Sequence, residues 1–260
     1  MQRYFIDLTK EEVKARGTIV ITGEDVHHLS NVMRMKSGQE ILCLTTDGFE
    51  AISTIDTITK EEVICLLHGW TNQNRELPIQ VTVASGLPKG DKLELIIQKG
   101  TELGANSFVP FQAARSITKL DQKKLQKKRA RWEKIAKEAA EQSYRNVVPV
   151  VHPVFTFKEL IQMVGEFDKC VVAYEESSKE GEQSRFSSLL QEMKSGQTLL
   201  LIFGPEGGLA EKEIEELETI GAVICGLGPR ILRTETAPLY ALSAISYQTE
   251  LLRGEILWEQ

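Results

Sequence analysis

Short apolar runs broken by turn residues dominate the first part of this 260-residue chain. The runs 39–45 and 49–55 flank Asp47-Gly48, a pair that favours a β-hairpin because glycine tolerates a positive φ. Further strands are expected at 4–7, 18–21 and 63–68, and the polar segment 70–76 has the composition of a linker. The pattern predicts a small β-rich domain over residues 1–72.

From residue 77 the spacing of apolar positions changes to alternating strands and helices. Strands are predicted at 79–85, 107–111 and 169–174, and helical spacing runs from 92 to 103. This alternation is typical of an α/β domain, which we expect over residues 73–260.

Two loops rich in Gly and Pro follow apolar runs near the C-terminus. A strand at 198–203, a helix at 209–220 and a strand at 222–227 predict a parallel β–α–β unit. Both loops then leave the same edge of the sheet, where ligands bind in open α/β folds, so they are expected to form two walls of one site. Neither loop carries a dinucleotide or P-loop motif, and ordinary strand–helix turns explain the spacing equally well.

Basic residues are concentrated in the middle of a chain whose formal net charge is −6. Residues 115–145 hold eleven Lys or Arg and four acidic residues, which indicates either a surface for phosphates or a solvated helix face. Trp132, Ile135, Ala136 and Ala139 recur at helical spacing, so this stripe is expected to bury Trp132 in the core rather than present it to a nucleic-acid base.

Several classes of protein are disfavoured by the composition. No run approaches the ~20 apolar residues of a membrane span, and the polar start MQRYFIDLTKEE lacks a signal-peptide core, so a cytoplasmic location without membrane association is expected. The four cysteines are far apart and have no histidine at ligand spacing, which favours reduced core thiols and no metal. Adjacent His27 and His28 are expected to serve structure or contact with a nucleic acid.

The segments LIFGPEGG (201–208) and GLGPRILRTETA (226–237) resemble the two cofactor loops of the SPOUT, or α/β-knotted, methyltransferases. Within that superfamily the whole chain is similar to the 16S ribosomal RNA uridine-N3 methyltransferases, with further matches at Arg3-Tyr4-Phe5, at 99–104 and at Glu141-Gln142-Ser143 with Arg145. The resemblance implies an N-terminal PUA-like barrel and a C-terminal SPOUT domain with a deep trefoil knot. It also implies that S-adenosylmethionine methylates N3 of one uridine (1498 in customary rRNA numbering) in the assembled small ribosomal subunit.

The same resemblance assigns site residues. The loop 174–176 joins the two glycine loops around the cofactor, and the expected cofactor contacts are Tyr174, Glu175, Phe203, Gly204, Pro205, Glu206, Gly207, Gly208, Leu227, Gly228, Ile231, Leu232, Thr234, Thr236 and Ala237. The expected RNA contacts are Arg3, His28, Arg34, Arg115, Lys124, Lys127, Lys128, Arg131 and Arg145.

Three residues, Arg233, Arg230 and Glu206, are the expected catalytic groups. Arg233, and after it Arg230, suits the charge that develops on the uracil carbonyls, because arginine stays protonated and offers a fork of donors. Glu206 or Glu235 can accept the N3 proton, but both have a rival role in satisfying free amides at a helix start, which is favoured for Glu235. Loss of the proton to water stays open as an alternative.

In the last predicted helix, 236–252, apolar or small residues cover a wider part of the surface than one contact with the core requires. Tyr240, Ala244, Tyr247 and Leu251 form one stripe and Ala237, Ala241, Ile245 and Gln248 another. A buried helix in a monomer and a partner surface explain this equally well, and dimerisation in related SPOUT enzymes favours a homodimer.

A noncatalytic RNA-binding or assembly factor is the alternative function, although it would not need both cofactor loops.

Overall fold

The computed structural model describes residues 1–71, 73–116, 122–175 and 185–252, with the first three residues of helix α4 described by backbone alone. Contacts divide the chain into two units, called here the N-terminal unit and the C-terminal unit. The N-terminal unit is Met1–Glu76 together with Ala140–Val147, and the C-terminal unit contains Leu77–Ala139 and the chain from Val148. The expected division between residues 72 and 73 did not foresee the segment 140–147.

The N-terminal unit is built on a five-stranded sheet. Its strand order is β1 (Gln2–Phe5), β3 (Glu40–Leu44), β4 (Glu50–Ile58), β5 (Glu62–Thr71) and β2 (Thr18–Thr22). The β1–β3 pair is parallel and the other pairs are antiparallel. Helix α1 (Lys10–Arg16) starts at a capping box of Thr9 and Glu12. Helix α2 (Glu24–His27) continues into the π-helical turn η1 (His28–Val32).

The predicted hairpin at Asp47-Gly48 is confirmed. Strands β3 and β4 pair antiparallel around it, and Gly48 has a φ of 80°. Strand β5 extends to Thr71, so the linker expected over 70–76 begins later than its polarity indicated. Tyr4, Ile19, Ile41 and Cys43 are among the side chains of one buried cluster in this unit.

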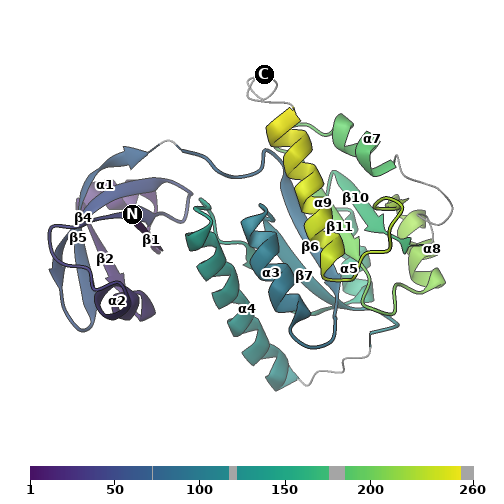
Figure 1. Ribbon diagram of the computed structural model, residues 1–260, viewed down its shortest axis with the longest axis horizontal. Helices are drawn as coiled ribbons and strands as arrows, with labels where there is room; N and C mark the ends of the chain where they lie inside the picture. The colour runs from purple at the N-terminus through teal and green to yellow at the C-terminus, as the bar shows by residue number, and fades with distance from the viewer. Residues whose placement is uncertain (72, 117–121, 176–184, 253–260) are drawn as a thin grey trace. The chain divides into compact units, whose positions relative to one another are not determined.

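A parallel sheet forms the centre of the C-terminal unit (Figure 1). Its order is β12 (Val223–Cys225), β10 (Lys169–Ala173), β11 (Thr198–Phe203), β6 (Gln80–Gly86), β7 (Ser107–Gln112) and β8 (Val150–Val151), and the short β9 (Phe155–Thr156) also pairs with β7. Every pair in this sheet is parallel. The predicted β–α–β unit is present, but β10 lies between its two strands.

Helices cover both faces of this sheet. One face packs against α3 (Lys92–Glu102), α4 (Gln122–Gln142), α7 (Arg185–Glu192) and α9 (Thr236–Ser246), and the other against α5 (Phe157–Val164) and α8 (Glu211–Thr219). Along β11, Leu199 and Leu201 enter the first core and Leu200 and Ile202 the second, as the period of two in a strand requires. The predicted α/β architecture is therefore confirmed, with helices on both faces of the sheet.

Other predictions concern single residues. Trp132 is 2% exposed and lies in the core, as its helical spacing indicated. The four cysteines are buried free thiols, as expected. None of the helices in the described ranges has the length and apolar character needed to cross a membrane. The strand order alone does not test the predicted knot, which stays a prediction.

Candidate functional site

A cavity of about 510 Å³ opens where β10 and β11 end in the C-terminal unit. Both glycine loops line it, so the prediction that they form two walls of one site is confirmed. The first wall is the loop 203–209 and the second is formed by Leu227, the segment 230–234 and Ala237. The remaining lining residues are Lys92, Arg115, Ala173, Tyr174 and Glu175.

The two walls are joined by a hydrogen bond. The Thr234 hydroxyl donates to the Gly204 carbonyl at 2.8 Å. Gly204 also has no room for a side chain, because a Cβ there would lie 2.9 Å from the backbone of Gly208 and Leu209. Gly208 follows with a φ of 70° and donates its amide to the Pro205 carbonyl. The first loop is thus a tight turn whose backbone faces the cavity without bulky side chains.

Lys92, at the first turn of α3, pairs with one carboxylate of the first wall and with Glu235, which lies next to the second wall in sequence. Its Nζ lies 2.9 Å from a Glu206 carboxylate oxygen and 3.2 Å from one of Glu235. The Glu206 carboxylate also accepts the Lys89 amide at 3.1 Å. Partial burial would raise the Glu206 pKa, but the hydrogen bonds from Lys92 and from backbone amides outweigh it and hold the pKa below its usual range. A carboxylate held in this way is a weak proton acceptor, so the arrangement favours a structural role for Glu206.

Glu235 occupies the N-cap position of α9, as its place in the sequence indicated. Its side chain, however, makes no capping hydrogen bond with the helix amides. The expectation that its carboxylate satisfies those amides was wrong, because the carboxylate pairs with Lys92.

Arg115 lines this cavity at an exposed position, and its predicted contact with RNA stays a prediction. Its guanidinium donates to the Gly207 carbonyl at 3.2 Å. The buried Glu213 of α8 fixes the neighbouring backbone, since its two carboxylate oxygens accept the Ala114 and Ala210 amides, each at 2.8 Å. The Arg115 guanidinium is therefore held beside the first loop by its bond to Gly207, and the backbone next to Arg115 is held by Glu213 of α8.

Most of the predicted cofactor residues line the cavity. The exceptions are Gly228 and Thr236, which are not part of its wall. Gly228 has a φ of 92° in the second loop. Tyr174 and Glu175 line the cavity, whereas position 176 of the expected third loop lies outside the described residues. Arg230 and Arg233 line the cavity and are exposed, which leaves both guanidinium groups accessible.

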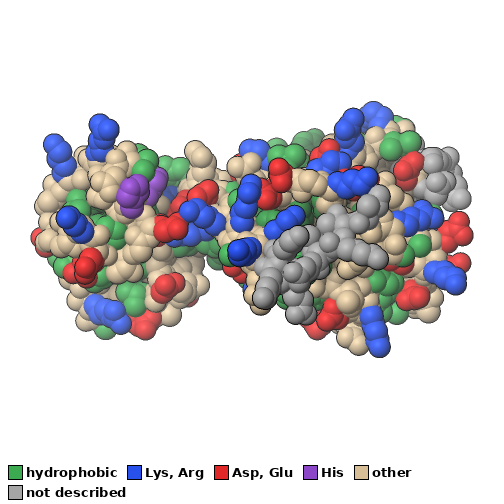
Figure 2. All heavy atoms as spheres, turned by 90° about the horizontal axis from the view of Figure 1, so that it is seen from below, with side chains coloured by type: hydrophobic (Ala, Val, Ile, Leu, Met, Phe, Trp, Pro, Cys, Tyr) green, Lys and Arg blue, Asp and Glu red, His purple; other side chains and the backbone are tan. Residues whose placement is uncertain are grey.

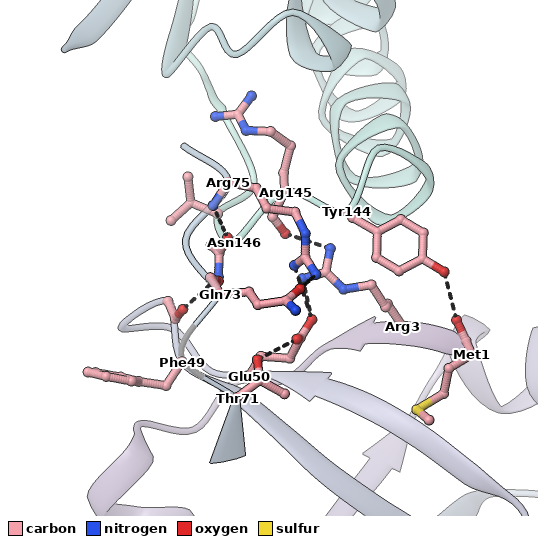
Figure 3. Close-up of polar contacts among 12 residues, drawn as sticks. Met1, Arg3, Phe49, Glu50, Thr71, Gln73, Arg75, Tyr144, Arg145 and Asn146 are labelled. Atoms are coloured by element: carbon pink, nitrogen blue, oxygen red, sulfur yellow. Dashed lines mark hydrogen bonds and ion pairs between the residues drawn. The ribbon is translucent and has the colours of Figure 1, made fainter. Parts of the chain in front are cut away.

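In the N-terminal unit, two of the predicted RNA contacts, Arg3 and Arg145, belong to a group of side chains joined by polar contacts (Figure 3). Arg3 is 4% exposed, pairs with Glu50 at 2.7 Å and donates to the Arg145 carbonyl at 3.0 Å. Arg145 is 2% exposed and forms an ion pair and hydrogen bonds with Glu76. Both guanidinium groups serve the packing of segment 140–147 against the sheet, and neither offers a surface to phosphate.

Two other predicted RNA contacts of this unit are exposed. His28 accepts or donates a hydrogen bond at 3.2 Å with the Tyr4 hydroxyl, and its ring packs edge-on against the Tyr4 ring. Arg34 lies at an exposed position with a φ of 52°, a conformation that a non-glycine residue adopts at a cost. Their roles in RNA contact stay predictions.

The predicted basic face of α4 is partly used within the protein. Arg131 pairs with Glu94 of α3 at 2.6 Å. Lys127 is exposed and Lys128 half-buried, while the side chain of Lys124 lies outside the described residues. Figure 2 shows Lys and Arg side chains interspersed with acidic ones over the face in view. Among the described residues, no group of three or more His, Cys, Asp or Glu side chains is placed to hold a metal ion.

Comparisons with known proteins agree with this geometry. A family model described as an RNA methyltransferase domain matches residues 75–246, and one described as an RNA methyltransferase PUA domain matches residues 21–67. The α/β unit with its two glycine loops is thus of the RNA methyltransferase class. The chain belongs to this RNA methyltransferase family, and the predicted combination of a PUA-like domain with a SPOUT methyltransferase fold is confirmed.

Individual relatives are similar to this chain over almost its whole length. It is 65% identical to ribosomal RNA small subunit methyltransferase E of Bacillus subtilis, over 98% of this chain and 100% of that protein. A ribosomal RNA small subunit methyltransferase E from Neisseria gonorrhoeae, solved with S-adenosyl methionine bound, is 26% identical, with a TM-score of 0.80 over 95% of this chain and 97% of that one. A putative methyltransferase from Legionella pneumophila in complex with the same cofactor is 28% identical, with a TM-score of 0.76 and the same coverage.

Proposed function

We propose that this protein transfers a methyl group from S-adenosylmethionine to N3 of a uridine, uridine 1498 in customary numbering, in 16S ribosomal RNA. The observation that carries the proposal is the cavity formed by both glycine loops in a chain of the RNA methyltransferase family. The similarity to ribosomal RNA small subunit methyltransferase E over the full length supports the ribosomal RNA substrate. Such a substrate also supports a cytoplasmic location.

The residues of the cavity fit a bent nucleoside cofactor that carries a positive charge. The backbone of Gly204–Gly208 is open to close approach, and Leu227, Ile231 and Leu232 offer an apolar side to the same space. The carboxylate of Glu175 lies in the lining, which suits a cationic ligand, whereas the Glu206 carboxylate in the same lining is paired with Lys92. When bound, S-adenosylmethionine supplies an electrophilic methyl group on its sulfonium.

Arg233 is the residue we propose to act on the acceptor uracil. Loss of the N3 proton puts negative charge on the ring carbonyls, and an exposed guanidinium in the cavity lining is placed to stabilise it. Arg230 is the second candidate from the same loop. Because Glu206 is held by Lys92 and the Lys89 amide, we favour release of the proton to water over transfer to this carboxylate.

Ligand binding and product mapping test this proposal. Calorimetry is expected to show binding of S-adenosylmethionine and S-adenosylhomocysteine but not ATP, whereas a nucleotide-dependent enzyme or a binding factor would not show this preference. Arg233→Ala is expected to lower methyl transfer by about 100-fold while cofactor affinity changes little, because its contact forms with the altered uracil. Equal losses of RNA binding and rate would assign Arg233 to anchoring. Mass mapping of ribosomal RNA from a deletion strain identifies the uridine.

We further propose a homodimer formed through α9 and the π-helical turn η2 (Tyr247–Leu252). Tyr240, Tyr247 and Leu251 are 41%, 53% and 73% exposed, while Ala241 and Ile245 on the other side are buried. Ala241 and Ile245 of one predicted stripe therefore pack in the core, whereas Tyr240, Tyr247 and Leu251 of the other offer an exposed surface to a partner and Ala244 between them packs against the core. Ala244→Glu is expected to split the dimer in light scattering, and a fully active monomer at micromolar concentration would contradict the proposal.

A further inference from the structure

Lys92 is a charged residue of the cavity that the pattern of the sequence did not single out. It belongs to α3, far in sequence from both glycine loops. Its Nζ is within 3.2 Å of two carboxylate oxygens, one of Glu206 in the first wall and one of Glu235, which follows the second wall directly in sequence but does not line the cavity. A single cation thus connects two loops that are otherwise joined by the Thr234–Gly204 hydrogen bond.

The two carboxylates have little else to neutralise them. Oε2 of Glu235, the oxygen nearest Lys92, is buried and has no hydrogen-bond partner in the described structure. Glu206 has only backbone amides besides Lys92 among its described partners. Without the ammonium group, two like charges would lie close together beside the cavity, which disfavours the arrangement of the two loops seen in the structure.

We infer that Lys92 is a positioning residue for cofactor binding, which holds the walls of the cavity together by neutralising Glu206 and Glu235 at once. The inference rests on the proposed function, since it takes S-adenosylmethionine as the ligand of this cavity. The ion pairs are partly shielded, with side-chain exposures of 32% for Lys92, 31% for Glu206 and 17% for Glu235. They are also the main cause of the raised Lys92 pKa, so the lysine is charged at any physiological pH.

The pH dependence of binding distinguishes this role from simple packing. In Lys92→Met the two carboxylates lose their cation, which raises the pKa of one of them. S-adenosylmethionine and S-adenosylhomocysteine should then bind about tenfold more weakly than to the wild type at about pH 8, and most of the loss should disappear at about pH 5.5, where one carboxyl takes up a proton. The other charged lining residues, Arg115, Glu175, Arg230 and Arg233, are the same in every variant and do not contribute to the difference.

Matched variants complete the experiment, with affinities measured by calorimetry. In Lys92→Met/Glu206→Gln, only one of the two carboxylates that repel each other remains charged. This variant should bind S-adenosylmethionine within about threefold of Glu206→Gln alone at both pH values. Lys92→Arg keeps the cation and should retain binding. Lys99→Met is the control, because Lys99 lies on the same helix and pairs with Glu102 outside the cavity. Far-UV circular dichroism and urea unfolding confirm that each variant is folded.

The outcomes separate the inference from the proposed function. Unchanged binding in Lys92→Met, or an equal loss at both pH values, would overturn the role of Lys92 while leaving the cofactor assignment intact. Failure of the wild type to bind either ligand would instead overturn the cofactor assignment. If Lys92→Met does not fold, Glu206→Gln and Glu235→Gln serve in its place: their effects on affinity should be non-additive because both act through one Nζ, and additive effects would overturn the inference.

Discussion

The two units contain charge clusters of opposite composition. In the N-terminal unit one carboxylate, Glu50, lies between two guanidinium groups, at 2.7 Å from Arg3 and 3.7 Å from Arg75. In the C-terminal unit one cation, Lys92, lies between two carboxylates. The first cluster is almost fully buried at Arg3 and Glu50, and the second borders an open cavity. Burial, rather than residue type, decides which cluster holds the fold together and which remains available to a ligand.

The largest effect is expected from breaking the buried cluster. Glu50→Leu leaves the Arg3 guanidinium without its carboxylate in a site where burial already lowers the Arg3 pKa and Glu50 opposes that shift. The free energy of unfolding in urea should fall by about 3–5 kcal/mol. The double variant Arg3→Met/Glu50→Leu removes both charges and should recover a large part of this loss. A double variant less stable than Glu50→Leu would contradict the assignment of the cost to an unpaired buried charge.

A glycine pair tests whether the cavity loop serves a ligand rather than the fold. Gly228 in the second loop and Gly221 after α8 have φ values of 92° and 91°, so a valine at either position strains the backbone by about 1–3 kcal/mol. Both variants should lose stability, but only Gly228→Val should also weaken S-adenosylmethionine binding, by about tenfold or more. Equal cofactor affinities in the two folded variants would count against the second loop as a cofactor wall.

The exposed Lys127 and the half-buried Lys128 of α4 should behave differently from both clusters. Lys127→Ala/Lys128→Ala is expected to weaken RNA binding and to reduce the slope of log affinity against log salt by about 1–2, because each phosphate contact releases counterions. Cofactor affinity should not change, since neither lysine lines the cavity. An unchanged salt slope would show that this part of α4 is only a solvated face. Arg131→Ala offers the comparison with a cation already paired to Glu94.

The smallest effect concerns Asp168, an exposed carboxylate whose hydrogen bonds are weakened by the surrounding water. Asp168 accepts the Thr198 amide and hydroxyl at 2.8 and 2.9 Å, and these bonds lower its pKa. Its contribution to stability is therefore present above the unfolded-state pKa of about 4 and is lost as the pH falls through the lower folded-state value. Asp168→Asn should flatten the acid side of the curve of unfolding free energy against pH, and an unchanged curve would contradict this.

Local sequence patterns predicted the strands, the hairpin and the two-walled site. Period-two alternation and Asp47-Gly48 act over a few residues, and both glycine loops follow their strands directly, so their placement needs little tertiary information. Lys92 was not predicted because a lysine at the start of a helix is usually solvated. Its role depends on Glu206 and Glu235, more than a hundred residues away in sequence.

The dependence on contacts between distant residues also explains why the burial of Arg3 and Arg145 was not predicted. Arg3 and Arg145 are of a residue type that is mostly exposed, and their family resemblance suggested RNA contact. Their burial depends on Glu50, Glu76 and the return of segment 140–147 to the N-terminal unit. Pairing of this kind is set by tertiary contacts and leaves no periodic signal in the sequence.

The return of segment 140–147 also has a consequence for synthesis of the chain. The hydrogen bond from Arg3 to the Arg145 carbonyl joins residues 142 positions apart, and Asn146 donates to the Gly48 and Gln73 carbonyls from the same segment. A ribosome making this protein releases the first 76 residues long before the residues that complete their unit. The N-terminal unit therefore cannot be completed until segment 140–147 has been synthesised. Contacts between residues so far apart in sequence form slowly in folding.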